Sequence, residues 1–201
     1  SLKRRSTAWY KPMNAKENTA LERLAALSLE KCLVRLSKVS AGTWQLVDTG
    51  GSSGTPGNAV GKYDFKNQPA AAVYFDIKGD FPMTSLMIFD PADIDCISKC
   101  FLGYSFPRQG GISQSDEVML LELGNIVLNS LSNSVFNALG ESFMPSVPQF
   151  VAGDALRIAE SVRAVAGAAQ TFNIVTSTID IQCDNRVSRS KVIALVPEHL
   201  A

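Results

Sequence analysis

The sequence has 201 residues, enough for one domain of ordinary size or two small repeats, and 46% of them are hydrophobic. This composition predicts a folded globular protein with a sizeable core and argues against intrinsic disorder. Basic and acidic residues balance, so the formal net charge is zero. A neutral chain argues against a nucleic-acid binder or a membrane-surface binder, because both depend on an excess of lysine and arginine.

No uninterrupted apolar run approaches the roughly 20 residues that are needed to span a bilayer. No secretory signal with a cleavage site is visible either. We therefore expect a cytoplasmic protein. The single basic cluster, Lys3, Arg4 and Arg5, is interpreted as a solvated terminus without a function.

The cysteines do not form a metal motif. Cys32, Cys96, Cys100 and Cys183 are scattered along the chain, and His199 is the single histidine. These are too few partners for a structural zinc site, so the sequence predicts buried, reduced thiols and no metal ligands.

The first helix is expected at residues 20–39, where leucines recur at helical intervals. Residues 43–48 have the composition of a strand. The stretch that follows, residues 50–61 (GGSSGTPGNAVG), is rich in glycine, serine and proline and predicts a mobile surface loop.

Two strand-like runs come next, at residues 71–78 and 83–89, and their short connection predicts an antiparallel hairpin. Asp90 is then a candidate N-cap and Pro91 suits the first helical position. A helix is expected from there to residue 102, with Gly103 closing it.

The second half begins after a linker rich in proline and glycine. Residues 115–139 predict the strongest helix of the chain, with Ser113 or Ser115 as its N-cap and Gly140 as its end. An extended run at 143–151, a helix at 154–165 and two long strands at 170–182 and 187–196 complete the pattern.

Both halves therefore show the order helix, strand, strand pair, which indicates an internal repeat. We expect an α+β fold of two pseudo-symmetric repeats, with a mainly antiparallel sheet covered by long helices. Residues 1–201 would form a single domain, with repeat one at about 18–103 and repeat two at about 113–201.

On the helix at 115–139, Glu122 and Asn125 lie one turn apart and share a face. The opposite arc is apolar, whereas their own arc also holds Asn129, Ser132 and Asn133. Uncharged amides are poorer helix formers than the lysine and glutamate of an ordinary solvated face. Two interpretations stay open: these side chains tolerate exposure, or a partner covers them. Two apolar residues on the same arc, Val118 and Phe136, point to a partner.

The segment Glu122-Leu-Gly-Asn125, followed by Pro148 in MPSVPQFVAGD, resembles the signature of the CheC/CheX/FliY phosphatases of bacterial chemotaxis. In the first half, AAAVYFDIKGDFPMTSLMIFDPADIDCISKCFLG is similar to the strand, strand, helix segment of that family. The resemblance covers most of the chain.

The resemblance implies a phosphatase that hydrolyses the aspartyl phosphate of a CheY-like response-regulator receiver domain. By analogy, Asn125 would orient the attacking water and Glu122 would accept hydrogen bonds from a lysine of the regulator. The partner-contacting residues would be Val118, Asn129, Ser132, Asn133, Phe136 and Pro148. The chain would need no cofactor of its own, because the Mg²⁺ belongs to the receiver domain. A CheD-like deamidase is a further possible partner, and the protein is expected to be a monomer or a homodimer.

Two departures from the family pattern matter. The family has Asp or Ser four residues before the Glu, where this chain has Val118. In the first-half helix the matching slots hold Arg23 and Ala26, or Glu22 and Ala25 in the adjacent register, so the first site is expected to be lost.

These departures keep an alternative open: a non-enzymatic, flagellar-switch-like module that binds a response regulator or another partner. A serine or cysteine hydrolase is not favoured, because the chain has one histidine and no Gly-x-Ser-x-Gly elbow.

Overall fold

The computed structural model describes residues 15–66, 68–107, 110–167 and 171–198. Lys3, Arg4, Arg5 and His199, which the sequence singled out, lie outside these residues, as does Gln170 at the expected start of a strand. Among the described residues, no helix is long and apolar enough to cross a membrane.

The centre of the molecule is a six-stranded sheet in which every neighbouring pair is antiparallel. The strand order is β1-β5-β6-β3-β2-β4. The strands are β1 (Thr43–Gly54), β2 (Ala70–Ile77), β3 (Met83–Phe89), β4 (Gln149–Gly153), β5 (Phe172–Cys183) and β6 (Arg186–Pro197). The hairpin expected in the first half is confirmed as β2 and β3, and the two long C-terminal strands are confirmed as β5 and β6.

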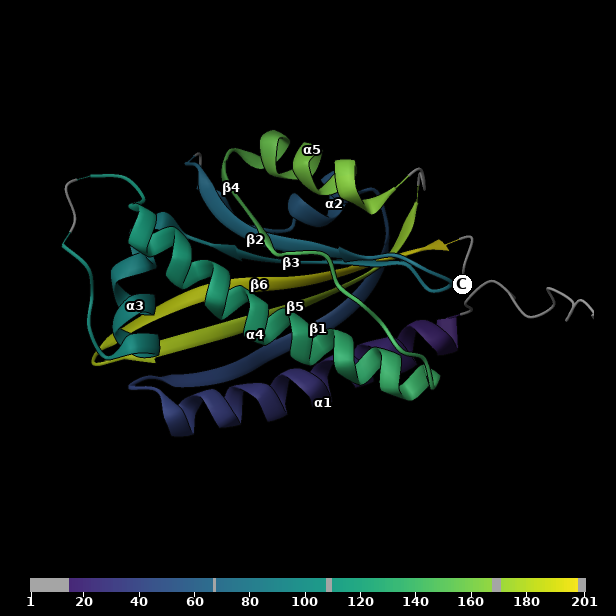
Figure 1. The fold of residues 1–201 in the computed structure, drawn as a ribbon, viewed down its shortest axis with the longest axis horizontal. Coiled ribbons are helices and arrows are strands. Elements are labelled where there is room, and N and C mark those ends of the chain that lie inside the picture. The colour runs from purple at the N-terminus through teal and green to yellow at the C-terminus, as the bar shows by residue number, and fades with distance from the viewer. Residues whose placement is uncertain (1–14, 67, 108–109, 168–170, 199–201) are drawn as a thin grey trace, which may run out of the picture.

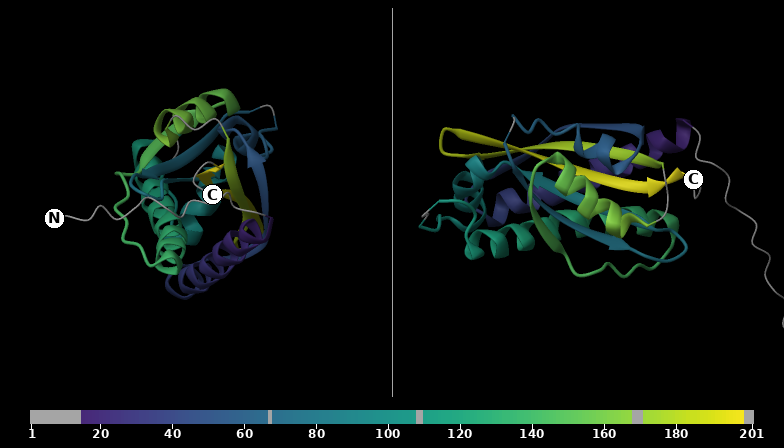
Figure 2. Two further views of the ribbon diagram at one scale, coloured as in Figure 1. Left: turned by 90° about the vertical axis from the view of Figure 1, so that its right-hand side faces the viewer. Right: turned by 90° about the horizontal axis from the view of Figure 1, so that it is seen from above.

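Helices cover both faces of this sheet (Figure 1). One face carries α1 (Ala15–Val39), α3 (Ile94–Leu102) and α4 (Gln114–Leu139), and the other carries α2 (Pro56–Val60) and α5 (Ala155–Ala166). Figure 2 shows the sheet between these two layers from two further directions. Each face has its own hydrophobic core, and the core under α1, α3 and α4 is the larger one. The α+β fold with an antiparallel sheet and covering helices is confirmed.

The topology is symmetric under exchange of the two halves. Leaving aside α3 and the short 3₁₀ turn before it, the first half runs α1-β1-α2-β2-β3 and the second runs α4-β4-α5-β5-β6. If β1, β2 and β3 are exchanged with β4, β5 and β6, respectively, the strand order of the sheet becomes the same order read from the other edge. α1 and α4 are therefore counterparts that lie side by side on one face, linked where the Ser28 hydroxyl donates to the Ser130 carbonyl at 2.7 Å.

The C-terminal ends of α3 and α4 lie where the sequence places them, whereas α1 begins at Ala15 and not at residue 20. Asp90 caps the 3₁₀ turn Pro91–Asp93 that leads into α3, and Gly103 ends α3 with φ 84°. Ser113, not Ser115, is the N-cap of α4: its hydroxyl accepts from the Asp116 amide, and the Asp116 carboxylate accepts from the Ser113 amide. Gly140 ends α4 in the left-handed conformation.

The prediction of a loop at residues 50–61 is wrong. Residues 50–54 extend β1 and pair with β5 from Gly50↔Thr176 to Gly54↔Phe172, so the partner strand overrides the low strand propensity of glycine and serine. Thr55 then caps α2 through a capping box with Asn58. The extended run expected at 143–151 is also shorter: its strand is β4, preceded by one bridge between Ile77 and Pro145.

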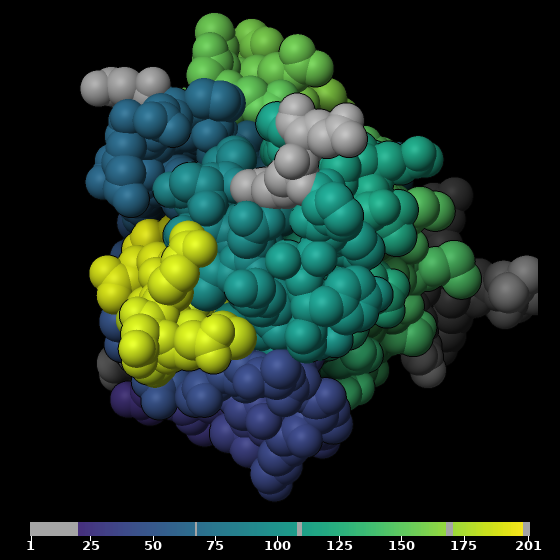
Figure 3. All heavy atoms as spheres, turned by 90° about the vertical axis from the view of Figure 1, so that its left-hand side faces the viewer, coloured from purple at the N-terminus to yellow at the C-terminus, as the bar shows by residue number. Residues whose placement is uncertain are grey.

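Segments that are distant in sequence meet at one end of the molecule. Figure 3 shows this end, where the tip of the β5–β6 hairpin, the region around α3 and the C-terminal end of α1 lie side by side. The Gly42 amide donates to the Cys100 carbonyl at 2.9 Å and ties the α1–β1 connection to α3. A Cβ at Gly42 would lie 2.5 Å from the Cβ of Cys100, so this close approach requires glycine.

Candidate functional site

The candidate site lies on the first half of α4. Gly124, between Glu122 and Asn125, allows the helix to approach the sheet: a Cβ there would lie 2.6 Å from Cγ1 of Val73 on β2. With Gly124 facing the sheet, Glu122 is turned toward solvent and Asn125 is half-buried beside it. The sequence Glu-x-Gly-Asn therefore fixes the packing of the helix as well as its polar face.

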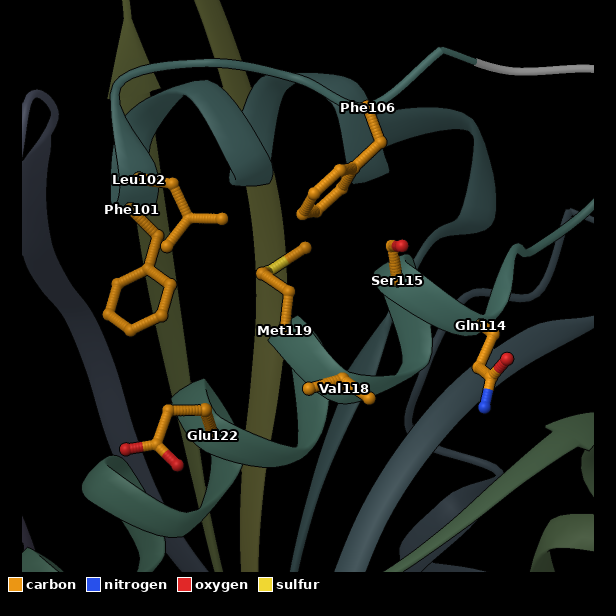
Figure 4. Close-up of a pocket in the computed structure, with 8 residues that line it drawn as sticks. All are labelled: Phe101, Leu102, Phe106, Gln114, Ser115, Val118, Met119 and Glu122. Carbon is orange, nitrogen blue, oxygen red and sulfur yellow. The ribbon is translucent and has the colours of Figure 1, made fainter.

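Glu122 lies at the rim of a pocket of about 430 Å³ between α3 and α4 (Figure 4). The lining is mostly apolar and includes Phe101, Leu102, Phe106, Val118 and Met119. Among the described residues, no cation forms an ion pair with Glu122. Its carboxylate is therefore available to a positively charged group from outside the chain.

Asn125 is held in place by its own helix. Its side-chain carbonyl oxygen accepts a hydrogen bond from the side-chain NH₂ of Asn129, one turn later, at 2.6 Å. A carboxamide has two donor hydrogens and two acceptor lone pairs. The bond from Asn129 uses one lone pair and orients the group, which leaves the second lone pair and the NH₂ of Asn125 for a water molecule.

The other residues expected on this face divide into two groups. Val118 is 60% exposed, Asn133 is exposed, and Asn129 and Pro148 are partly exposed. Pro148 directly precedes β4, in a segment fixed to the end of β2 by the Ser146 amide, which donates to the Asp76 carbonyl at 2.8 Å. These four residues can be reached by a partner.

Ser132 and Phe136, in contrast, are buried, so the expectation that they lie on an exposed, partner-binding face is wrong. Phe136 packs against Phe81 of the β2–β3 turn and against Phe143, with ring centroids 5.7 and 4.8 Å away. The apolar side chain that suggested a partner is thus covered by the protein's own chain. The hydroxyl of Ser132 is buried without a hydrogen-bond partner among the described residues.

A feature missed at the sequence level is the groove between α1 and α4. It has a volume of about 560 Å³ and is lined from α1 by Lys31 and Arg35, and from α4 by Asn129, Asn133 and Asn137. The spacing of these asparagines by four residues is visible in the sequence. Only the packing of α1 beside α4 reveals that cations face them.

In the first half of the chain, Arg23 is exposed and Ala26 is half-buried on α1, as Glu122 and Asn125 are on α4. The loss of the first site stays a prediction. The described residues contain no group of three or more His, Cys, Asp or Glu side chains that could hold a metal ion. Cys32, Cys96 and Cys100 are buried free thiols, and Cys183 is partly exposed.

No protein-family model matches the sequence, and no curated protein matches it. Solved structures do match over nearly the whole chain. FliY from Thermotoga maritima superposes with a TM-score of 0.66 at 11% identity, covering 94% of this chain and 93% of that one. The middle domain of FliM from H. pylori gives 0.58 at 13% identity, with coverages of 92% and 94%. CheX from Borrelia burgdorferi, in a complex with CheY, BeF₃ and Mg²⁺, gives 0.54 at 12% identity, with coverages of 88% and 97%.

The chain has the fold of the CheC/CheX/FliY proteins. The fold predicted from the resemblance is thereby confirmed. At 11 to 13% identity the likeness extends to the fold alone, so the activity and the partner depend on the chemistry of the site.

Proposed function

We propose that this protein belongs to the CheC/CheX/FliY family and hydrolyses the aspartyl phosphate of a CheY-like receiver domain in chemotaxis signalling. The observation that carries the proposal is the pair on α4: a solvent-facing Glu122 that forms no ion pair within the described residues, and an Asn125 oriented by Asn129. The similar CheX was crystallised in a complex with CheY, which supports a receiver domain as the partner.

The chemistry requires little from this chain. An aspartyl phosphate is a mixed anhydride with a good leaving group, so in-line attack of water on phosphorus breaks the bond to the carboxylate and releases inorganic phosphate. Catalysis then consists of positioning that water, much as a glutamine does in nucleotide hydrolysis. The free hydrogen-bonding positions of Asn125 suit this role, and the carboxylate of Glu122 would accept hydrogen bonds from a lysine of the receiver domain.

Valine at position 118, where the family has Asp or Ser, has a structural consequence. Val118 extends the apolar lining of the pocket beside Glu122, so this position offers a partner an apolar contact in place of a hydrogen bond. Mg²⁺ would be held by the receiver domain. A CheD-like partner and the oligomeric state stay predictions from the resemblance.

The test is phosphate release from phosphorylated receiver domains of the same organism. Wild-type protein is expected to accelerate release, and Asn125→Ala is expected to lower the catalysed rate by about 10²-fold, as for loss of a group that acts in the transition state. Asn185→Ala is the matched control, because Asn185 is exposed at the β5–β6 turn, away from α4. Equal basal rates with and without wild-type protein would contradict the phosphatase and favour a binding module.

A further inference from the structure

The α1–α4 groove combines two cations with a row of amides. Lys31 and Arg35 are exposed and lie one turn apart on α1. They face Asn129, Asn133 and Asn137, which repeat once per turn on α4. Cys32 and Leu36, which are 6% and 3% exposed, also line the groove and belong to the core beneath.

The positive charge of this groove is local, because the chain as a whole is neutral. No carboxylate is among the residues that line it, and within the described part of the chain neither Lys31 nor Arg35 forms an ion pair. Guanidinium and ammonium groups beside amide donors are the usual partners of carboxylates and phosphates. The groove is therefore complementary to an anionic ligand.

The length of the groove selects among anions. The eight-residue separation from Asn129 to Asn137 corresponds to about 12 Å along a helix. That is longer than a single phosphate group and matches a peptide segment of several residues. The two cations, at the one-turn spacing of roughly 5–6 Å, would meet two carboxylates rather than one.

We propose that the groove between α1 and α4 docks an acidic segment of the partner, with carboxylates on Lys31 and Arg35 and polar groups on Asn133 and Asn137. This inference rests on the proposed function, since the partner is the receiver domain that carries the aspartyl phosphate. Asn129 joins the two regions: it lines the groove and donates to Asn125. A segment docked there lies next to the water-positioning side chain, so the groove sets partner affinity and register while Glu122 and Asn125 act at the phosphate.

The experiment is a titration with receiver domains of the same organism, each loaded with BeF₃⁻ and Mg²⁺. The double variant Lys31→Glu/Arg35→Glu is expected to raise the Kd of the bound receiver domain by about tenfold or more and to flatten or reverse its salt dependence, because salt then screens a repulsion at these two positions in place of an attraction. The control is Lys62→Glu/Arg163→Glu, which changes the net charge equally. These residues are exposed and lie in and beside the layer of α2 and α5, on the opposite face of the sheet, so the control is expected to bind like wild type. Circular dichroism and thermal unfolding verify that both variants fold.

Kinetics separate the groove from the reacting site. In phosphate release, the groove variant is expected to raise KM and keep the wild-type kcat, whereas Asn125→Ala lowers kcat. An unchanged Kd and KM in the groove variant, with active wild type, would overturn the docking surface and leave the phosphatase standing. Failure of every receiver domain to bind wild type would overturn both. Charge-dependent binding to phosphatidylglycerol vesicles, with unchanged receiver affinity, would assign the groove to a membrane surface instead.

Discussion

Gly124 determines how closely α4 packs against the sheet at the turn that carries Glu122 and Asn125. It separates Glu122 from Asn125, and its missing side chain sets the distance between α4 and β2. A larger residue would push the helix outward at the turn that carries both polar groups. The polar pair and the sheet contact therefore depend on the same three-residue step.

We expect Gly124→Ala to destabilise the protein by about 1–3 kcal/mol, even though alanine is the better helix former by about 1 kcal/mol. The reason is steric, because the new Cβ would lie 2.6 Å from Cγ1 of Val73. Urea unfolding measures the effect. Gly57→Ala in α2 is the control: its nearest neighbour is Oγ1 of Thr55 at 3.5 Å, an ordinary contact, so this change is expected to be neutral or stabilising.

A second variant tests the cause. Val73→Gly in the Gly124→Ala background removes the Cβ and both methyl groups of Val73, which would lie 2.7, 2.6 and 3.3 Å from the new Cβ, so the double variant is expected to lose less stability than the sum of the two single changes. Additive losses, or a Gly124→Ala protein as stable as wild type, would contradict the close contact between α4 and β2.

Two residues on the same arc of α4 differ in burial, which helical spacing does not predict. Val118 and Phe136 fall on one arc of α4, yet Val118 is 60% exposed and Phe136 is 3% exposed. The difference comes from Phe81 and Phe143, which lie far from each other in sequence and cover only the later turns of the helix. Helical periodicity gives the direction of a side chain but cannot reveal what another segment places over it.

Among the elements, β1 differs most from expectation. Its second half, GGSSG, has the composition of a loop, yet it pairs residue by residue with β5. β1 is an edge strand, so one side of its backbone is paired and the other is open. A long, regular neighbour supplies the hydrogen bonds that the sequence of β1 does not favour by itself.

This pairing predicts that Gly50 can be replaced by a strand-forming residue. A Cβ at Gly50 meets nothing within 4 Å, so Gly50→Thr is expected to stabilise the protein by about 0.5–1 kcal/mol. Gly79→Thr is the matched comparison: the space there is also open, but φ is +132°, and threonine would be strained. Thermal unfolding of both variants measures the contrast; loss of stability in Gly50→Thr would argue for a loop in place of the strand.

At the scale of the whole molecule, the layer of α1, α3 and α4 buries thiols against the sheet. Burial raises the pKa of the Cys32 thiol. It also raises the pKa of the Cys100 thiol, with a further contribution from the neighbouring Cys96. An unfolded thiol loses its proton near pH 8.5. The unfolded chain therefore releases these protons at lower pH than the folded protein does.

The two thiols therefore leave the free energy of unfolding unchanged below about pH 8.5. They lower it as the pH rises from there toward their raised folded pKa values. The slope is at most about 1.4 kcal/mol per pH unit for each thiol. Urea unfolding between pH 7.5 and 9.5 measures it. Cys100→Ala is expected to start from a lower stability and to decline less steeply; parallel curves for the two proteins would contradict the role of the buried thiol.

The main helices and the strand pairs follow from the amino-acid sequence, because helical leucine spacing, strand composition and caps such as Ser113, Gly103 and Gly140 act over short distances. The sequence also picked out Glu122 and Asn125. Three features result from tertiary contacts instead: GGSSG is a strand, Phe136 is covered, and Lys31 and Arg35 face the asparagines of α4. These three features depend on contacts between segments that are distant in sequence, and local periodicity and propensity do not predict such contacts.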